Sequence, residues 1–89
     1  MSDKKACIRV TGKVQGVYFR ASTREKALEL GIKGFVENCA DGDVYVEAEG
    51  AHLDDFIKWL HQGPAAAKVE DVSVDFREKT GFNTFQIRY

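Results

Sequence analysis

The fold of this 89-residue chain is decided by residues 43–64, which read DVYVEAEGAHLDDFIKWLHQGP. The first seven residues alternate, which predicts a strand with Val44, Val46 and Ala48 facing in and Asp43, Tyr45, Glu47 and Glu49 facing out. From Leu53 the apolar residues Phe56, Ile57 and Leu60 follow at helical spacing, and Gly63-Pro64 stops the pattern. The stretch therefore predicts a half-buried strand followed by an amphipathic helix.

Further strands are predicted on both sides of this unit. Residues 7–11 alternate, with Ile8 and Val10 on one face, and residues 32–37 form a second apolar run. Asp41-Gly42 is a strong hairpin signal between residues 32–37 and the strand that follows. Towards the end of the chain, two more strands are marked by Val72, Val74 and Phe76 and by Phe85, Ile87 and Tyr89.

A first helix is predicted between the first two strands. Ser22-Thr23-Arg24-Glu25 fits a capping box and places the helix start at Ser22, while Gly31 supplies a left-handed residue at its end. The resulting fold class is α+β, a ferredoxin-like βαββαβ sandwich. It has an antiparallel sheet, two helices on one face and a short extra C-terminal strand. Many activities share this architecture, so it does not define the function.

Length and charge limit the function classes. The chain predicts a single domain over residues 1–89, and 13 Lys+Arg against 14 Asp+Glu give a net charge of −1. Nucleic-acid and membrane-surface binders usually carry a basic excess, so neither partner is expected. No apolar run approaches the roughly 20 residues of a membrane span. The charged opening residues 1–5 do not begin a signal peptide, and we expect a cytoplasmic protein with Cys7 and Cys39 as free thiols.

The loop between the first strand and the first helix carries the chemistry. It reads Gly12-Lys13-Val14-Gln15-Gly16-Val17-Tyr18-Phe19-Arg20. Backbone amides at such a turn can converge on an anion, and the start of the following helix adds partial positive charge. Arg20 adds a permanently charged fork that matches a phosphoryl group. The loop therefore indicates an anion site, with an ordinary strand-to-helix turn and a solvated arginine as the alternative.

Two motifs resemble the acylphosphatase family. The run from Val10 to Arg20 looks like the first signature of that family, and Gly34-Phe35-Val36-Glu37-Asn38 followed by Gly42, Val44 and Gly50 looks like the second. The ending Phe85-Gln86-Ile87-Arg88-Tyr89 is also similar to the usual ending of the family. The resemblance covers essentially the whole chain.

The resemblance implies hydrolysis of acyl phosphates to a carboxylate and inorganic phosphate, without metal or cofactor. The arginine matching Arg20 and the backbone amides of Gln15, Gly16, Val17, Tyr18 and Phe19 would bind the phosphoryl group, while Asn38 would position the attacking water. The leaving carboxylate belongs to an acid of pKa roughly 4 and departs without a general acid. The reaction then needs mainly alignment and charge stabilisation. The expected partners are a small acyl phosphate and its product phosphate, which would also inhibit; we expect a monomer.

Residue patterns alone place Asn38 less firmly than Arg20. An asparagine before a hairpin is commonly a turn residue. We also expect the second strand to run antiparallel to the first, which need not bring Asn38 beside the loop. The pairing of Arg20 with Asn38 therefore rests on the resemblance.

Glu37 departs from the family, which more often has a basic or neutral polar residue at this position. Strand alternation should point Glu37 away from the side that Asn38 faces. We hypothesise that its charge weakens substrate capture.

Two alternative functions remain for this fold. A non-catalytic phosphate-binding or other anion-binding module would use the same loop. An RNA-recognition domain shares the βαββαβ order and exposes aromatic residues on its open sheet face, but here that face of the third strand is acidic. His52 and His61 have no metal-ligand spacing with cysteines or carboxylates, and no metal site is expected.

Overall fold

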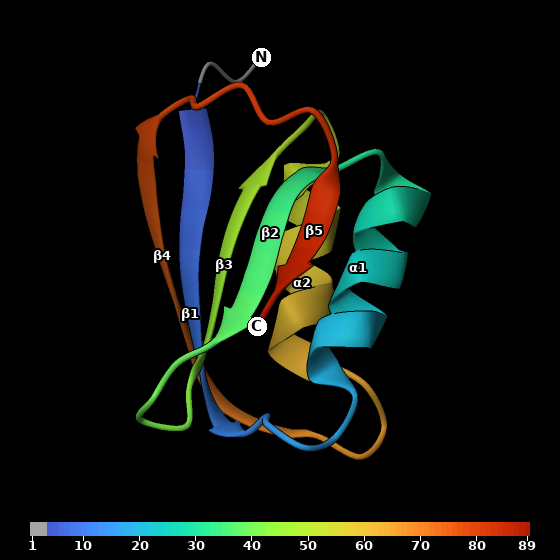
Figure 1. Cartoon of the computed structure of the whole chain (residues 1–89), viewed down its shortest axis with the longest axis vertical. Helices are drawn as coiled ribbons and strands as arrows, with labels where there is room; N and C mark the ends of the chain where they lie inside the picture. Colours follow the sequence, from blue (N-terminus) through green and yellow to red (C-terminus); the bar gives the residue numbers. More distant parts are fainter. Residues whose placement is uncertain (1–3) are drawn as a thin grey trace.

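Two helices cover one face of a five-stranded sheet in the computed structural model, which describes residues 4–89 (Figure 1). The first three residues of the charged opening segment lie outside this range. The elements are β1 (Lys4–Lys13), α1 (Phe19–Leu30), β2 (Lys33–Asn38), β3 (Val44–Glu49), α2 (Leu53–Gln62), β4 (Lys68–Glu78) and β5 (Phe85–Arg88). The predicted ferredoxin-like order with its extra terminal strand is confirmed.

The sheet has the strand order β4-β1-β3-β2-β5. Its first four strands pair antiparallel, whereas β5 pairs parallel with β2, so the extra strand makes the sheet mixed. Because β3 lies between β1 and β2 and is antiparallel to both, β1 and β2 run parallel to each other. The expectation that the second strand runs antiparallel to the first was wrong.

The core lies between the sheet and the helices. The inward-facing residues predicted for β3 are fully buried, and Val44, Val46 and Ala48 pair with Val10, Ile8 and Ala6 of β1. The stripe on α2 also packs inward, with Phe56 and Leu60 fully buried. As predicted, α2 stops at Gly63-Pro64: its last residue is Gln62, and Gly63, with a left-handed φ of 69°, donates its N–H to Trp59 O at 2.8 Å.

The start of α1 differs from the prediction. The helix begins at Phe19, with Tyr18 in a left-handed conformation at the N-cap position and no side-chain cap. The N–H of Ser22 donates to Tyr18 O at 3.0 Å, so Ser22 already lies inside the helix and the capping-box prediction was wrong. The first N–H groups of a helix have no partner within it, and here no side chain occupies them. This leaves the positive end of α1 available to an anion.

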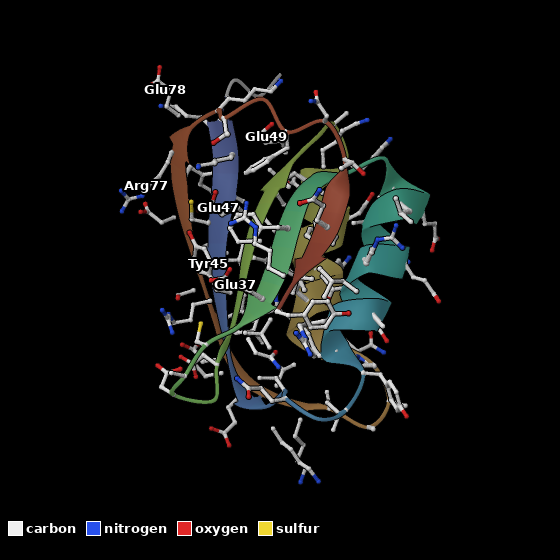
Figure 2. All side chains as sticks on the ribbon, viewed as in Figure 1. Glu37, Tyr45, Glu47, Glu49, Arg77 and Glu78 are labelled. Carbon is white, nitrogen blue, oxygen red and sulfur yellow. The ribbon has the colours of Figure 1, made fainter. Side chains whose placement is uncertain are left out.

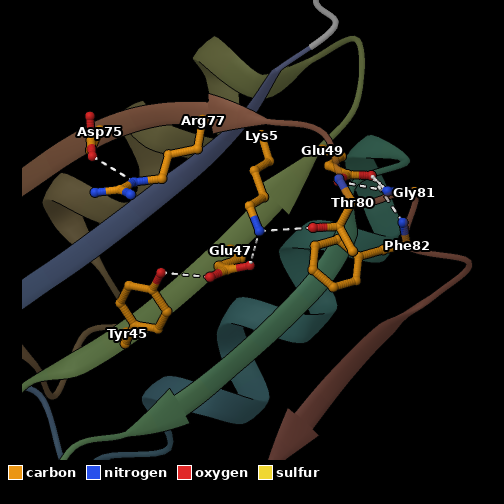
Figure 3. Close-up of polar contacts among 9 residues, drawn as sticks. All are labelled: Lys5, Tyr45, Glu47, Glu49, Asp75, Arg77, Thr80, Gly81 and Phe82. Atoms are coloured by element: carbon orange, nitrogen blue, oxygen red, sulfur yellow. Dashed lines mark hydrogen bonds and ion pairs between the residues drawn. The ribbon is translucent and has the colours of Figure 1, made fainter.

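Glu49 was expected to face outward, yet it is buried, with 3% of its surface exposed. Its carboxylate accepts four hydrogen bonds of 2.7–3.2 Å from the backbone N–H groups of Thr80, Gly81 and Phe82 (Figure 3). These residues belong to the loop that carries the chain from β4 to β5 at the opposite sheet edge. Glu49 therefore fixes the crossing that places β5 beside β2.

Polar side chains on the open face of the sheet contact one another; Figure 2 labels Tyr45 and Glu47 among them. Tyr45 Oη and Lys5 Nζ donate to Glu47 at 2.6 and 2.8 Å (Figure 3). Desolvation opposes ionisation of Glu47, but these hydrogen bonds outweigh it and lower the pKa of the carboxyl. The guanidinium of Arg88 lies 3.7 Å from the centre of the Phe35 ring. Aromatic rings covered in this way do not offer the stacking platform of an RNA-recognition domain.

Candidate active site

The loop after β1 is pinned by two buried valines and turns its other residues outward. Val14 and Val17 are 0% and 9% exposed. Between and after them, Gly16 and Tyr18 are exposed and have left-handed φ values of 74° and 61°. Such a value is uncommon for tyrosine, and it directs the chain straight into α1. The alternation of buried and outward residues shapes a short concave turn at the start of the helix.

A hollow of about 420 Å³ opens beside this turn. Its lining residues come from the loop, the first turn of α1 and the ends of two strands: Val14, Gly16, Tyr18, Phe19, Arg20, Ala21, Asn38, Ile87 and Tyr89. Both residues predicted to be catalytic, Arg20 and Asn38, line it. Of the predicted phosphate-binding residues Gly16, Tyr18 and Phe19 line it, whereas Gln15 and Val17 do not.

The strand directions explain why these residues meet. Since β1, β2 and β5 run parallel to one another, their C-terminal ends point toward the same end of the molecule (Figure 1). The loop follows β1, Asn38 ends β2, and Ile87 and Tyr89 lie at the end of β5. The site is thus assembled where three strands end beside the start of α1.

Arg20 lies in the first turn of α1 and is held by the end of β5. Its Nη1 donates to Arg88 O at 3.1 Å, and its Cζ lies 4.7 Å from the centre of the Tyr89 ring. A guanidinium has several N–H donors, so these contacts orient the side chain and leave donors for an anion. Sequence reasoning missed the part that Arg88 and Tyr89 play, and the only signal for it was the family-like ending of the chain.

Asn38 shares the inward face of β2 with Val36, because alternate residues of a strand face the same side. Its Oδ1 atom is buried and accepts no hydrogen bond from residues 4–89. Buried polar atoms are normally paired, and an unpaired one at a hollow is a common mark of a functional group. Among the described residues its side chain makes no turn hydrogen bond either, which disfavours the alternative of a simple turn residue.

Glu37 lies on the opposite face of the sheet from Asn38. It is aligned with Tyr45 of β3 and Arg88 of β5, and it does not line the hollow. Figure 2 shows it on the face turned away from the helices. The prediction that strand alternation points Glu37 away from Asn38 is confirmed.

Other candidate chemistry lies outside this hollow. Cys7 and Cys39 are free thiols, as predicted, and desolvation raises the pKa of Cys39. Within residues 4–89 no group of three or more His, Cys, Asp or Glu side chains could hold a metal ion. In the same range, no helix is long and apolar enough to cross a membrane.

Comparison with known proteins identifies the family of the chain. The family model for acylphosphatase matches residues 6–87. An acylphosphatase of Pelotomaculum thermopropionicum is 44% identical over the full length of both chains, and one of Haloquadratum walsbyi is 45% identical over 94% of this chain and 92% of its own. The crystal structure of acylphosphatase from Bacillus subtilis superposes with a TM-score of 0.92 at 36% identity, covering 97% of this chain and 99% of that one. The chain belongs to the acylphosphatase family.

Proposed function

We propose that this chain is an acylphosphatase that hydrolyses acyl phosphates in the hollow between α1 and the ends of β2 and β5. The observation that carries the proposal is the meeting of Arg20 and the unpaired, buried Asn38 Oδ1 at the uncapped start of α1. A positive binding end and an unpaired amide oxygen belong to residues that line one hollow, which supports binding of both a phosphoryl group and a water molecule there. Membership of the family supports a small acyl phosphate as the substrate.

Arg20 and backbone amides bind the phosphoryl group in this proposal. The guanidinium donates from its free N–H groups, and the N–H groups of residues 15–19 surround the remaining oxygens. The dipole of α1 adds favourable charge at the same point. Because phosphoryl transfer develops charge on these oxygens, fixed donors that need no reorganisation stabilise the transition state.

Asn38 orients the attacking water. A water molecule that donates a hydrogen bond to Asn38 Oδ1 is held with a lone pair free to approach phosphorus opposite the leaving carboxylate. The carboxylate leaves without protonation, since its conjugate acid has a pKa of roughly 4. No residue with a carboxylate or imidazole side chain is among those that line the hollow. We therefore assign the water's proton to a phosphoryl oxygen.

Further features of the chain support our expectations about the acyl group, inhibition by phosphate, the oligomeric state and the location. Tyr18 and Tyr89 are 82% and 99% exposed, so the acyl group faces an open rim. Inorganic phosphate keeps the group that the site binds, and we expect it to inhibit as a product. Apart from Tyr18 and Tyr89 at this rim, the exposed large apolar side chains among residues 4–89 are Leu28 on α1 and Phe76 on β4, on two different elements, which supports a monomer. The free thiols support a reducing, cytoplasmic location.

Hydrolysis of benzoyl phosphate, followed by ultraviolet absorbance with a chelator present, tests the proposal. We expect turnover that survives the chelator and falls about 10²–10³-fold in Arg20→Gln, as for loss of one transition-state donor. Arg77→Gln is the matched control, because Arg77 is exposed on β4 at the far sheet edge. A folded wild type that binds phosphate without turnover would favour the non-catalytic anion-binding module. Loss of activity with the chelator would overturn the metal-free mechanism.

A further inference from the structure

The side chain of Gln15 joins the phosphate loop to the β2–β3 hairpin. Its Nε2 donates to Cys39 O at 2.8 Å and to Asp43 O at 2.9 Å. Gln15 is only partly exposed and does not line the hollow. Both N–H groups of one amide are therefore used on the two carbonyls that flank the turn after Asn38.

The two acceptors are central to the hairpin. Asp43 O also accepts the N–H of Cys39 at 2.8 Å, and Cys39 O also accepts the N–H of Gly42 at 3.2 Å. The Gln15 amide thus donates hydrogen bonds to the same two carbonyl oxygens that accept the backbone hydrogen bonds of the turn. Cys39 directly follows Asn38, so the clamp acts on the backbone next to the residue that we propose to orient water.

The strand contacts of Asn38 reach the loop only indirectly within residues 4–89. Its own Oδ1 accepts no hydrogen bond from the described residues, and β2 is joined to β1 only through β3. The loop lies beyond Lys13, the last residue of β1, where the ladder has ended. The Gln15 side chain adds a direct hydrogen-bonded tie between the loop and the hairpin, beside the packing of Val14 and Val17 in the core.

We propose that Gln15 is a positioning residue that holds Asn38 in register with the phosphate loop through these two hydrogen bonds. The inference rests on the proposed function and adds a second role to Gln15, whose backbone amide faces the phosphoryl group in that proposal. Loss of the clamp leaves Arg20 and the start of α1 in place, because β5 and the helix hold them. It therefore affects alignment of the water more than binding of phosphate.

Kinetics of Gln15→Met and Gln15→Glu test the clamp. Methionine keeps the length of the side chain without a donor, and glutamate turns a carboxylate toward two carbonyl oxygens. We expect kcat for benzoyl phosphate to fall roughly tenfold or more in both variants, while the inhibition constant of inorganic phosphate changes less than about threefold. Gln62→Met, at the exposed end of α2, is the matched control and should be unchanged.

A second control separates positioning from general loss of stability. Val74→Ala removes apolar contacts on β4 at the far edge of the sheet and lowers stability without touching the hollow. It should retain kcat at a temperature where both it and Gln15→Met are folded. Unchanged kcat in folded Gln15→Met would overturn the proposal. Equal losses of kcat and phosphate affinity would also overturn it, since they would assign Gln15 to the anion cradle alone.

A nuclear magnetic resonance titration with inorganic phosphate tests the clamp independently of turnover. In the wild type we expect phosphate to shift both the loop amides and the side-chain amide of Asn38. In Gln15→Met the loop amides should still shift, while the response of Asn38 should be reduced at least twofold. An equal Asn38 response in the two proteins would refute the clamp. If the wild type does not hydrolyse benzoyl phosphate, the proposed function is refuted. The phosphate titration then still tests whether Gln15 positions Asn38.

Discussion

Replacing Asn38 with leucine should make the protein more stable and nearly inactive. Leucine has a branched side chain of similar size but no polar atom. It would place methyl groups where the Asn38 Oδ1 atom is now buried without a partner from residues 4–89. Val14 and Ile87 line the same hollow and offer apolar neighbours. The substitution therefore removes a polar atom whose burial is unfavourable and removes the acceptor that we propose to hold the attacking water.

The sizes of the two effects follow from the contacts. A buried polar atom without a hydrogen bond costs about 1–3 kcal/mol. Since Asn38 is only partly buried as a residue, we expect a gain near the lower end, about 1 kcal/mol. For a domain of this size that gain corresponds to a rise in Tm of roughly 4–8 °C. Loss of one preorganised polar group at a reaction centre typically lowers kcat by about 10²–10³-fold.

Thermal and urea unfolding give the stability change, and benzoyl phosphate hydrolysis gives kcat. Asn83→Leu is the matched control, because Asn83 is exposed in the loop before β5 and should show neither effect. A lower unfolding free energy in Asn38→Leu would refute the claim that Oδ1 is unfavourably buried. Activity within about threefold of the wild type would refute the assignment of Asn38 to the water.

Three further predictions concern the sheet. In Glu47→Gln the free energy of unfolding at pH 7 should fall by roughly 1–2 kcal/mol, since the charged hydrogen bonds from Lys5 and Tyr45 weaken. The pKa of Glu47 is lowered from its ordinary 4.5, so its contribution to the free energy of unfolding is complete above pH 4.5 and is lost as the pH falls through the folded pKa. The free energy of unfolding should therefore fall less steeply with acid in the variant. Parallel plots of unfolding free energy against pH for the two proteins would contradict this. Glu49→Gln should destabilise by about 2 kcal/mol in urea unfolding and expose the amides of residues 80–82 to hydrogen exchange, and unchanged exchange would argue against the anchor. Gly34→Ala should cost at least about 3 kcal/mol by the same unfolding assay, because its φ of 148° disfavours a side chain and a Cβ would overlap Glu47 O; Gly81→Ala, where a Cβ meets open space, should cost much less.

The function of the family was readable from two linear motifs, whereas the layout of the site was not. Arg20 and Asn38 stand in those motifs, and both line the hollow. The start of α1 was misplaced because Ser22 and Glu25 match a local capping pattern. In the folded chain the left-handed Tyr18 occupies the N-cap position, four residues before Ser22. The packing of the whole loop, with Val14 and Val17 buried, sets the start of the helix and overrides the local capping pattern.

Local patterns in the sequence by themselves determined the strands, the presence of two helices, the hairpin at Asp41-Gly42 and the inward faces of β3 and α2. Periodicity indicated the strands and α2, whereas turn and cap residues indicated the hairpin and α1. These depend on neighbours a few residues apart, whose spacing already separates apolar from polar faces. Only the tertiary structure decided that β1 and β2 run parallel to each other, that β5 joins parallel to β2, and that Glu49 is buried under a loop 31–33 residues away. Strand pairing and the burial of a carboxylate depend on contacts between distant segments, which no local period encodes. The meeting of Arg20 with Asn38 follows from those contacts.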